Sequence, residues 1–144
     1  MISVPKKIII VEDQSDVADL LEEMLSLDQY QVIKIHSSTG ALSVIRAENP
    51  DVVLLDIMMP DVSGLEVLRF MRREPGLQQI PVVIVSAKAL PADIRKGFEE
   101  GATAYLTKPV DMRTLRVTVA RVIHETETQD AAPITDDEEE HKTK

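Results

Sequence analysis

Polar and charged side chains follow four short apolar runs of this chain, at the points where the runs end. In chain order they are Glu12 with Asp13, then Asp56, Ser86 and Lys108. Three carboxylates that lie close together repel one another, and a hard divalent cation relieves that repulsion. An ammonium group and a hydroxyl group can hold phosphoryl oxygens. If the fold brings these side chains together, the chemistry they favour is metal-dependent phosphoryl transfer.

The apolar runs themselves predict how these side chains are positioned. They cover residues 8–11, 52–55, 82–85 and 105–107. A run that is apolar at nearly every position is typical of a strand covered on both faces, as in a parallel sheet with helices on each side. The carboxyl ends of parallel strands point the same way, and ligands bind in the crevice there. The sequence therefore predicts that the five polar side chains gather at one edge of a sheet.

Helical patterns alternate with the strands. An apolar face at 17, 20, 21, 24 and 25 predicts a first helix, which Ser15 or Asp13 could cap. Further helices are predicted at 37–49, 65–74, 91–100 and from 111 onward. The strand at 30–35 is interrupted by Lys34, which suits a sheet edge. Five βα units predict a five-stranded parallel sheet in the order 2-1-3-4-5, a flavodoxin-like, three-layer, doubly wound α/β fold.

Composition limits the class of protein. The 144 residues carry no cysteine, so disulfides and thiolate metal sites are excluded. No run approaches the ~20 apolar residues of a membrane span, and no signal peptide precedes the first strand. We therefore expect a cytoplasmic protein without membrane contact.

Charge divides the chain into two parts. The net charge is −9, and residues 125–144 hold eight acidic and two basic side chains. Residues 1–124 are only mildly acidic and offer no basic stripe for direct nucleic-acid binding. We predict one domain over residues 1–124 and an acidic, disordered tail or linker over 125–144.

Asp56 is the candidate nucleophile, because it follows the central strand of the predicted sheet. An aspartyl phosphate is a known covalent intermediate. Lys108 and a divalent metal would neutralise the developing charge, and Ser86 would hydrogen-bond a phosphoryl oxygen.

The chain resembles the receiver domain of bacterial two-component response regulators over about residues 5–124. The matching stretches are IIIVED at 8–13, DVVLLDIMMPDVSGLE at 51–66, IPVVIVSAK at 80–88 and GATAYLTKP at 101–109. The resemblance implies that Asp56 accepts a phosphoryl group from a histidine kinase or phosphotransfer protein, with Lys108 as the phosphate partner. It also implies a Mg²⁺ (or Mn²⁺) ion held directly by Asp13, Asp56 and the backbone carbonyl of Met58, and through water by Glu12.

A signalling switch is the function that this resemblance implies. Ser86 and Tyr105 would be the switch pair, and the bond between Lys108 and Pro109 would be cis. Phosphorylation would change the face formed by residues 90–101 and 103–122. That face would contact a downstream target, an attached output domain, or a second copy in a phosphorylation-dependent homodimer. The only reactions expected are Mg²⁺-dependent self-phosphorylation and self-dephosphorylation, so the protein is not expected to be an enzyme.

Two alternatives use the same fold class. A haloacid-dehalogenase-type phosphohydrolase has an aspartyl nucleophile, but it needs a second aspartate two residues later, where this chain has Met58. A flavodoxin-type electron carrier needs a Ser/Thr/Gly-rich first loop, where this chain has Glu12, Asp13 and Gln14. The chain also departs from the family, which more often has two aspartates at 12–13 and Phe at 110 in place of Val110.

Overall fold

The computed structural model describes residues 4–131. Within them, strands and helices alternate strictly, except for one short 3₁₀ helix after the first α-helix. The elements are β1 Lys7–Val11, α1 Ser15–Met24, η1 Ser26–Asp28, β2 Gln31–Ile35, α2 Ala41–Glu48, β3 Val52–Leu55, α3 Gly64–Arg73, β4 Val82–Ser86, α4 Pro91–Glu99, β5 Ala104–Thr107 and α5 Met112–Ala131. All strand pairs are parallel, and the order is β2-β1-β3-β4-β5. The predicted fold class is confirmed.

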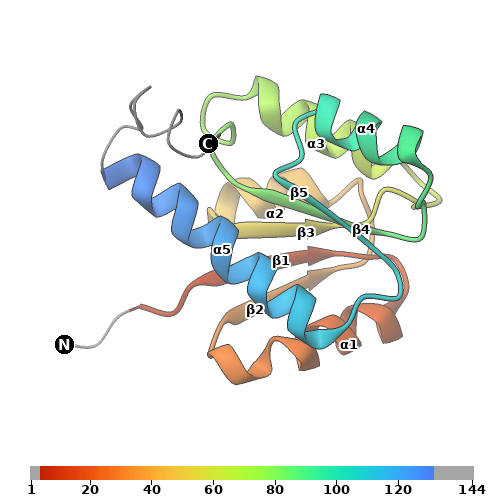
Figure 1. Cartoon of the computed structure of the whole chain (residues 1–144). Helices are drawn as coiled ribbons and strands as arrows, with labels where there is room; N and C mark the ends of the chain where they lie inside the picture. The colour runs from red at the N-terminus through yellow and green to blue at the C-terminus, as the bar shows by residue number, and fades with distance from the viewer. Residues whose placement is uncertain (1–3, 132–144) are drawn as a thin grey trace, which may run out of the picture.

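Three layers follow from the way the strand side chains alternate. Alternate residues of β1 and β3 face opposite sides of the sheet. One set packs in a cluster with α2 and α3: Ile9, Val11, Val53 and Leu55. The residues between them along each strand pack in a cluster with α1 and α5: Ile8, Ile10, Val52 and Leu54. Both faces are therefore apolar, which explains the continuous apolar runs. Figure 1 shows α1 and α5 on one side of the sheet and α2, α3 and α4 on the other.

One helix start and one helix cap differ from the predictions. Helix α2 begins at Ala41 rather than at 37, because the buried Ser38 hydroxyl donates to the Val62 carbonyl at 2.6 Å and holds the preceding turn away from helical geometry. Gln14 is the N-cap of α1 and is extended, and no side chain caps this helix. Asp13 is therefore not engaged as a cap, and its carboxylate is available to the sheet edge.

Helix α5 is longer than expected. It continues through residues 125–131, which the sequence assigned to an acidic tail, and the rest of that segment, 132–144, lies outside the described residues. An ion pair between Lys6 and Glu127 joins α5 to the chain before β1. The Thr126 hydroxyl donates to the Val122 carbonyl within the helix. Neither α5 nor any other helix within residues 4–131 is both long and apolar enough to span a membrane.

The backbone near the functional edge of the sheet agrees with the sequence. The peptide bond between Lys108 and Pro109 is cis, which confirms the prediction from the resemblance. Gly101 follows α4 with φ of 112°, a left-handed geometry in which glycine is favoured at a helix end.

Candidate functional site

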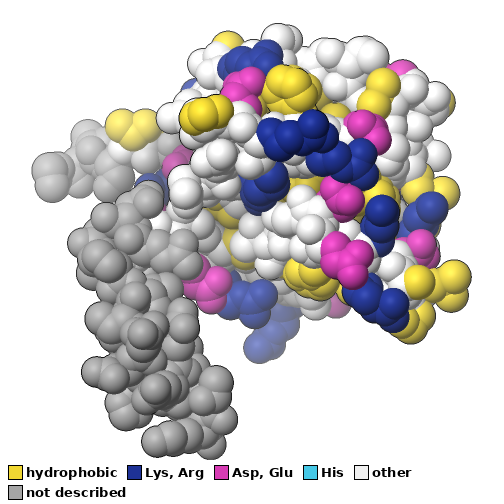
Figure 2. Space-filling model, turned by 90° about the horizontal axis from the view of Figure 1, so that it is seen from above, with side chains coloured by type: hydrophobic (Ala, Val, Ile, Leu, Met, Phe, Trp, Pro, Cys, Tyr) yellow, Lys and Arg dark blue, Asp and Glu magenta, His cyan; other side chains and the backbone are white. Residues whose placement is uncertain are grey.

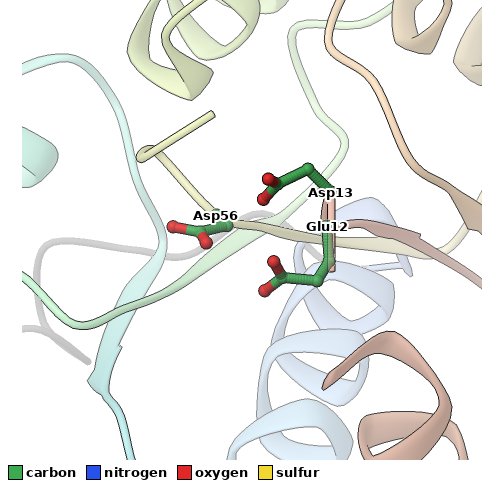
Figure 3. A group of neighbouring side chains, drawn as sticks. All are labelled: Glu12, Asp13 and Asp56. Carbon is green, nitrogen blue, oxygen red and sulfur yellow. The ribbon is translucent and has the colours of Figure 1, made fainter. Parts of the chain in front are cut away.

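The three predicted carboxylates converge at the carboxyl ends of β1 and β3. Val11 pairs with Leu55 in the sheet, and the Asp56 amide donates to the Val11 carbonyl at 3.0 Å. The residues that follow the two strands therefore leave the sheet side by side. One carboxylate oxygen from each of Glu12, Asp13 and Asp56 lies within 4.8 Å of the others. Figure 3 shows the three side chains around one common space.

Lys108 brings a positive charge into this cluster. Its Nζ donates to Glu12 Oε1 at 2.6 Å and to Asp56 Oδ2 at 3.0 Å. Its amide donates to the Ser86 carbonyl at 2.9 Å, which fixes the loop after β5 to the end of β4. Burial lowers the pKa of Lys108, but the hydrogen bonds to Glu12 and Asp56 outweigh burial, so the pKa is raised. Lys108 is therefore a firmly protonated bridge between two carboxylates.

Burial distinguishes the carboxylates from one another. Glu12 is only 2% exposed and Asp56 only 6% exposed, whereas Asp13 is half-buried. Burial raises the pKa of Glu12, and the Lys108 hydrogen bond opposes that shift. One ammonium group cannot balance three carboxylates. The donor set consists entirely of oxygens, so it fits a hard cation such as Mg²⁺ or Mn²⁺.

The loop after β3 is held close to Asp56. The Met58 amide donates to Asp56 Oδ1 at 3.0 Å, while the Met58 side chain is 50% exposed. The Ser63 hydroxyl accepts from the Leu65 amide at 3.2 Å and caps α3. A Cβ atom on Gly64 would lie 2.2 Å from the Asp56 carbonyl oxygen. Only glycine allows the start of α3 to approach the Asp56 backbone this closely.

The predicted switch pair lies beside this cluster. Ser86 is fully buried, and its Oγ accepts from the Lys88 amide at 3.2 Å. The Tyr105 hydroxyl donates to the Lys88 carbonyl at 2.7 Å. The backbone of Lys88 thus connects the two side chains. The structure thus brings together the candidate site residues of the sequence analysis, which are Glu12, Asp13, Asp56, Met58, Ser86, Tyr105 and Lys108.

Some residues of the site were not singled out from sequence. Ser38 holds the segment before α2 against the loop after β3. His36 Nδ1 lies 2.9 Å from the Glu12 carbonyl oxygen. Gly64 makes room at Asp56. A lone serine or histidine after a strand carries no sequence signal, whereas a glycine directly after the serine cap of a helix was a visible one.

Comparisons with known proteins agree with this geometry. The family model described as "Response regulator receiver domain" matches residues 8–120. The polar-differentiation response regulator DivK of Brucella anthropi is 34% identical over 108 residues, which are 75% of this chain and 88% of that protein. A CheY-like response regulator receiver domain from Methanospirillum hungatei is 26% identical, with a TM-score of 0.81, 88% of this chain covered and 99% of that one. The BeF3-activated receiver domain of DrrB is 28% identical, with a TM-score of 0.75, and the match covers 84% and 99%.

The chain belongs to the response regulator receiver domain family. Members of this family act in two-component signalling, where phosphorylation controls a protein switch. Histidine kinases or phosphotransfer proteins are the partners that such a domain implies. Receiver domains bind Mg²⁺ at an acidic pocket, and Glu12, Asp13 and Asp56 form an acidic group of that kind in this chain. Neither the phosphohydrolase nor the flavodoxin alternative is supported.

Proposed function

We propose that Asp56 accepts a phosphoryl group from a phosphohistidine and thereby switches the contacts of this protein. The observation that carries the proposal is the Lys108 ammonium, which bridges Asp56 and Glu12. An Asp56 oxygen attacks the phosphorus atom, the bond between phosphorus and the histidine nitrogen breaks, and the imidazole leaves with that electron pair. Incubation with Mg²⁺ and acetyl phosphate tests the proposal, because intact-mass spectrometry should show one added phosphoryl group.

The chain's own residues prepare Asp56 for this step. Lys108 offsets negative charge that develops on the transferred oxygens, and the Met58 amide is aimed at the same carboxylate. Ser86 can donate its hydroxyl to a phosphoryl oxygen. These groups are held by backbone contacts at the strand ends, so they need little rearrangement.

A divalent ion would bind beside these groups. We propose Asp13, Asp56 and the Met58 carbonyl as direct ligands and Glu12 as a ligand through water. A bound Mg²⁺ or Mn²⁺ would neutralise phosphoryl charge.

Mg²⁺ is expected to stabilise the protein through these ligands. At an ion concentration about ten times the dissociation constant, the free energy of unfolding should rise by about 1.4 kcal/mol. Thermal unfolding with and without Mg²⁺ measures this effect. Asp13→Asn should lose most of the response, whereas the exposed Asp16→Asn should retain it. An equal response in both variants would contradict the assignment of Asp13.

The effect of phosphorylation would reach a partner through Ser86 and Tyr105. When Ser86 donates to a phosphoryl oxygen, the contacts around Lys88 change, and Tyr105 is hydrogen-bonded to that residue. The surface of α4, β5 and α5 would then bind a downstream target, an output domain or a second copy. Coupling of this kind needs only two packings that differ by a few kcal/mol.

A groove beside Lys108 supports a protein as the phosphoryl donor. It has a volume of about 310 Å³ and is lined mainly by apolar side chains of α1 together with Pro109 and Val110. Leu20 in this groove is half exposed. A histidine kinase or phosphotransfer protein docked here would lie next to Asp56.

Met58→Asn is expected to shorten the lifetime of the phosphorylated form. The Met58 side chain cannot orient an attacking water by strong hydrogen bonding, whereas an amide can. One such hydrogen bond corresponds to an acceleration on the order of tenfold. Loss of the added mass over time measures the rate. Val62→Asn on the same loop is the control, and an unchanged lifetime in Met58→Asn would show that this position does not limit hydrolysis.

A further inference from the structure

Helix α4 approaches the sheet through a glycine. Gly97 is the one buried residue of this helix, and the large apolar side chains at its two ends, Leu90 and Phe98, are exposed. Figure 2 shows the face over α3 and α4, where basic, acidic and apolar side chains lie intermixed. α4 is therefore not anchored by an apolar side chain of its own that is fully buried.

The Tyr105 ring occupies the space that a side chain at position 97 would need. A Cβ atom built on Gly97 would lie 2.8 Å from Tyr105 Cδ2 and 2.9 Å from Cε2. It would also lie 2.9 Å from Cδ1 of Ile84. These separations are far inside the ordinary contact distance between carbon atoms. The ring and any larger residue at position 97 cannot both keep their present places.

From this ring position, Tyr105 contacts the segment that follows Ser86. The Tyr105 hydroxyl donates to the Lys88 carbonyl, and the Lys88 amide donates to Ser86 Oγ. The ring also packs against the core cluster that contains Ile84. The same side chain thus lies on Gly97 with its ring and reaches Lys88 with its hydroxyl.

We propose that Gly97 is a positioning residue for Tyr105. The missing Cβ leaves room for the ring in the place from which its hydroxyl binds Lys88, the residue whose amide binds Ser86. The proposal rests on the function proposed above, because the switch matters only if Asp56 is phosphorylated. Gly97 touches neither the acidic cluster nor the phosphoryl site. Its role lies in transmission, and the chemistry at Asp56 does not depend on it.

Gly97→Ala separates transmission from chemistry. Alanine favours the helix, so α4 itself gains from the change. The added methyl group must displace either the ring or the helix, and both movements break the contact between Tyr105 and α4. Ile84 can yield more easily, because its Cδ1 is the end of a flexible side chain. Gly76→Ala is the matched control, since a Cβ there has no atom within 4 Å.

Fluorine NMR on protein labelled with 3-fluorotyrosine tests the proposal. The chain has two tyrosines, and Tyr30 packs against the opposite core cluster, so it is an internal reference. The probe is beryllofluoride with Mg²⁺, a mimic of the phosphoryl group. In the wild-type protein and in Gly76→Ala, the Tyr105 signal should shift on addition of the probe. In Gly97→Ala without the probe, the Tyr105 fluorine should have a chemical shift typical of a more solvent-exposed ring. Addition of the probe should then change that chemical shift much less than in the wild-type protein, while the Tyr30 signal is unchanged.

Two further measurements keep the outcomes distinct. Phosphoryl incorporation from acetyl phosphate should stay within about twofold of wild type in Gly97→Ala, because the acidic cluster is untouched. Should Gly97→Ala unfold, Gly97→Ala/Tyr105→Ala should recover most of the lost melting temperature, whereas Gly97→Ala/Ile84→Val should not. If Gly97→Ala/Ile84→Val recovered the melting temperature and Gly97→Ala/Tyr105→Ala did not, the role of Tyr105 would be overturned.

A Tyr105 signal in Gly97→Ala that starts and shifts as in wild type, with normal phosphoryl incorporation, would overturn the role of Gly97 and leave the proposed function standing. Absence of phosphoryl incorporation in the wild-type protein would instead overturn the proposed function.

Discussion

Asp56→Asn is expected to abolish phosphoryl incorporation. The amide keeps the size of the side chain and one oxygen, but it is a far weaker nucleophile than a carboxylate. We expect a loss of at least about 100-fold, as is usual when a covalent nucleophile is removed. Intact-mass spectrometry after incubation with Mg²⁺ and acetyl phosphate measures the incorporation directly.

Asp61→Asn is the control for this experiment. Asp61 lies on the same loop, but its carboxylate is engaged with the Thr39 amide at 3.0 Å, away from the cluster. It should gain one phosphoryl group as the wild-type protein does. The same mass gain in Asp56→Asn would place the acceptor elsewhere and refute the assignment.

Gly64→Ala is expected to cause a large loss of stability, although it leaves every charge in place. The added Cβ would lie 2.2 Å from the Asp56 carbonyl oxygen and 2.8 Å from the Ile57 Cα atom. Both are backbone atoms, so they cannot rotate away as a side chain does. Overpacking of this kind costs typically 1–3 kcal/mol, and we expect about 3 kcal/mol here. Urea unfolding with an unchanged m-value measures the effect.

The same substitution should also disturb the chemistry. Movement of the Asp56 backbone would carry the carboxylate away from Lys108 and from the Met58 amide. Phosphoryl incorporation should therefore slow even under conditions where the variant is folded. Gly76→Ala should change the free energy of unfolding by no more than about 0.5 kcal/mol. A Gly64→Ala protein as stable as Gly76→Ala would contradict this account.

The fold could be predicted because its signals are local. Each central strand is covered on both faces, so its apolar run is visible without knowledge of its neighbours. Lys34 suggested that β2 lies at an edge, and its Nζ is in fact paired with Asp19 and Glu22. The start of α2 could not be predicted, because the Ser38 hydroxyl binds a carbonyl 24 residues away.

The convergence of the site followed from the same reasoning. A residue that directly follows a parallel strand lies at a known edge of the sheet, so Asp56 and Lys108 could be placed together before the geometry was known. Gly64 and Gly97 are different cases. Their importance lies in the atoms that occupy the space beside them. Those atoms come from Asp56 and Tyr105, each eight residues away in sequence but on a different loop or element, so only the fold brings them close.

The place of residue 4 and of the last turns of α5 has a practical consequence. Every strand runs toward the acidic cluster, so β1 begins at the opposite pole, and the ion pair between Lys6 and Glu127 brings the last turns of α5 to the same pole. Figure 1 shows the start of β1 and the last turns of α5 on that side of the sheet. A fused protein, or an immobilising tag, that is attached where the described residues begin or end, at 4 or at 131, is therefore tethered away from Asp56. Such attachment leaves the phosphoryl acceptor facing the solution, open to a donor protein.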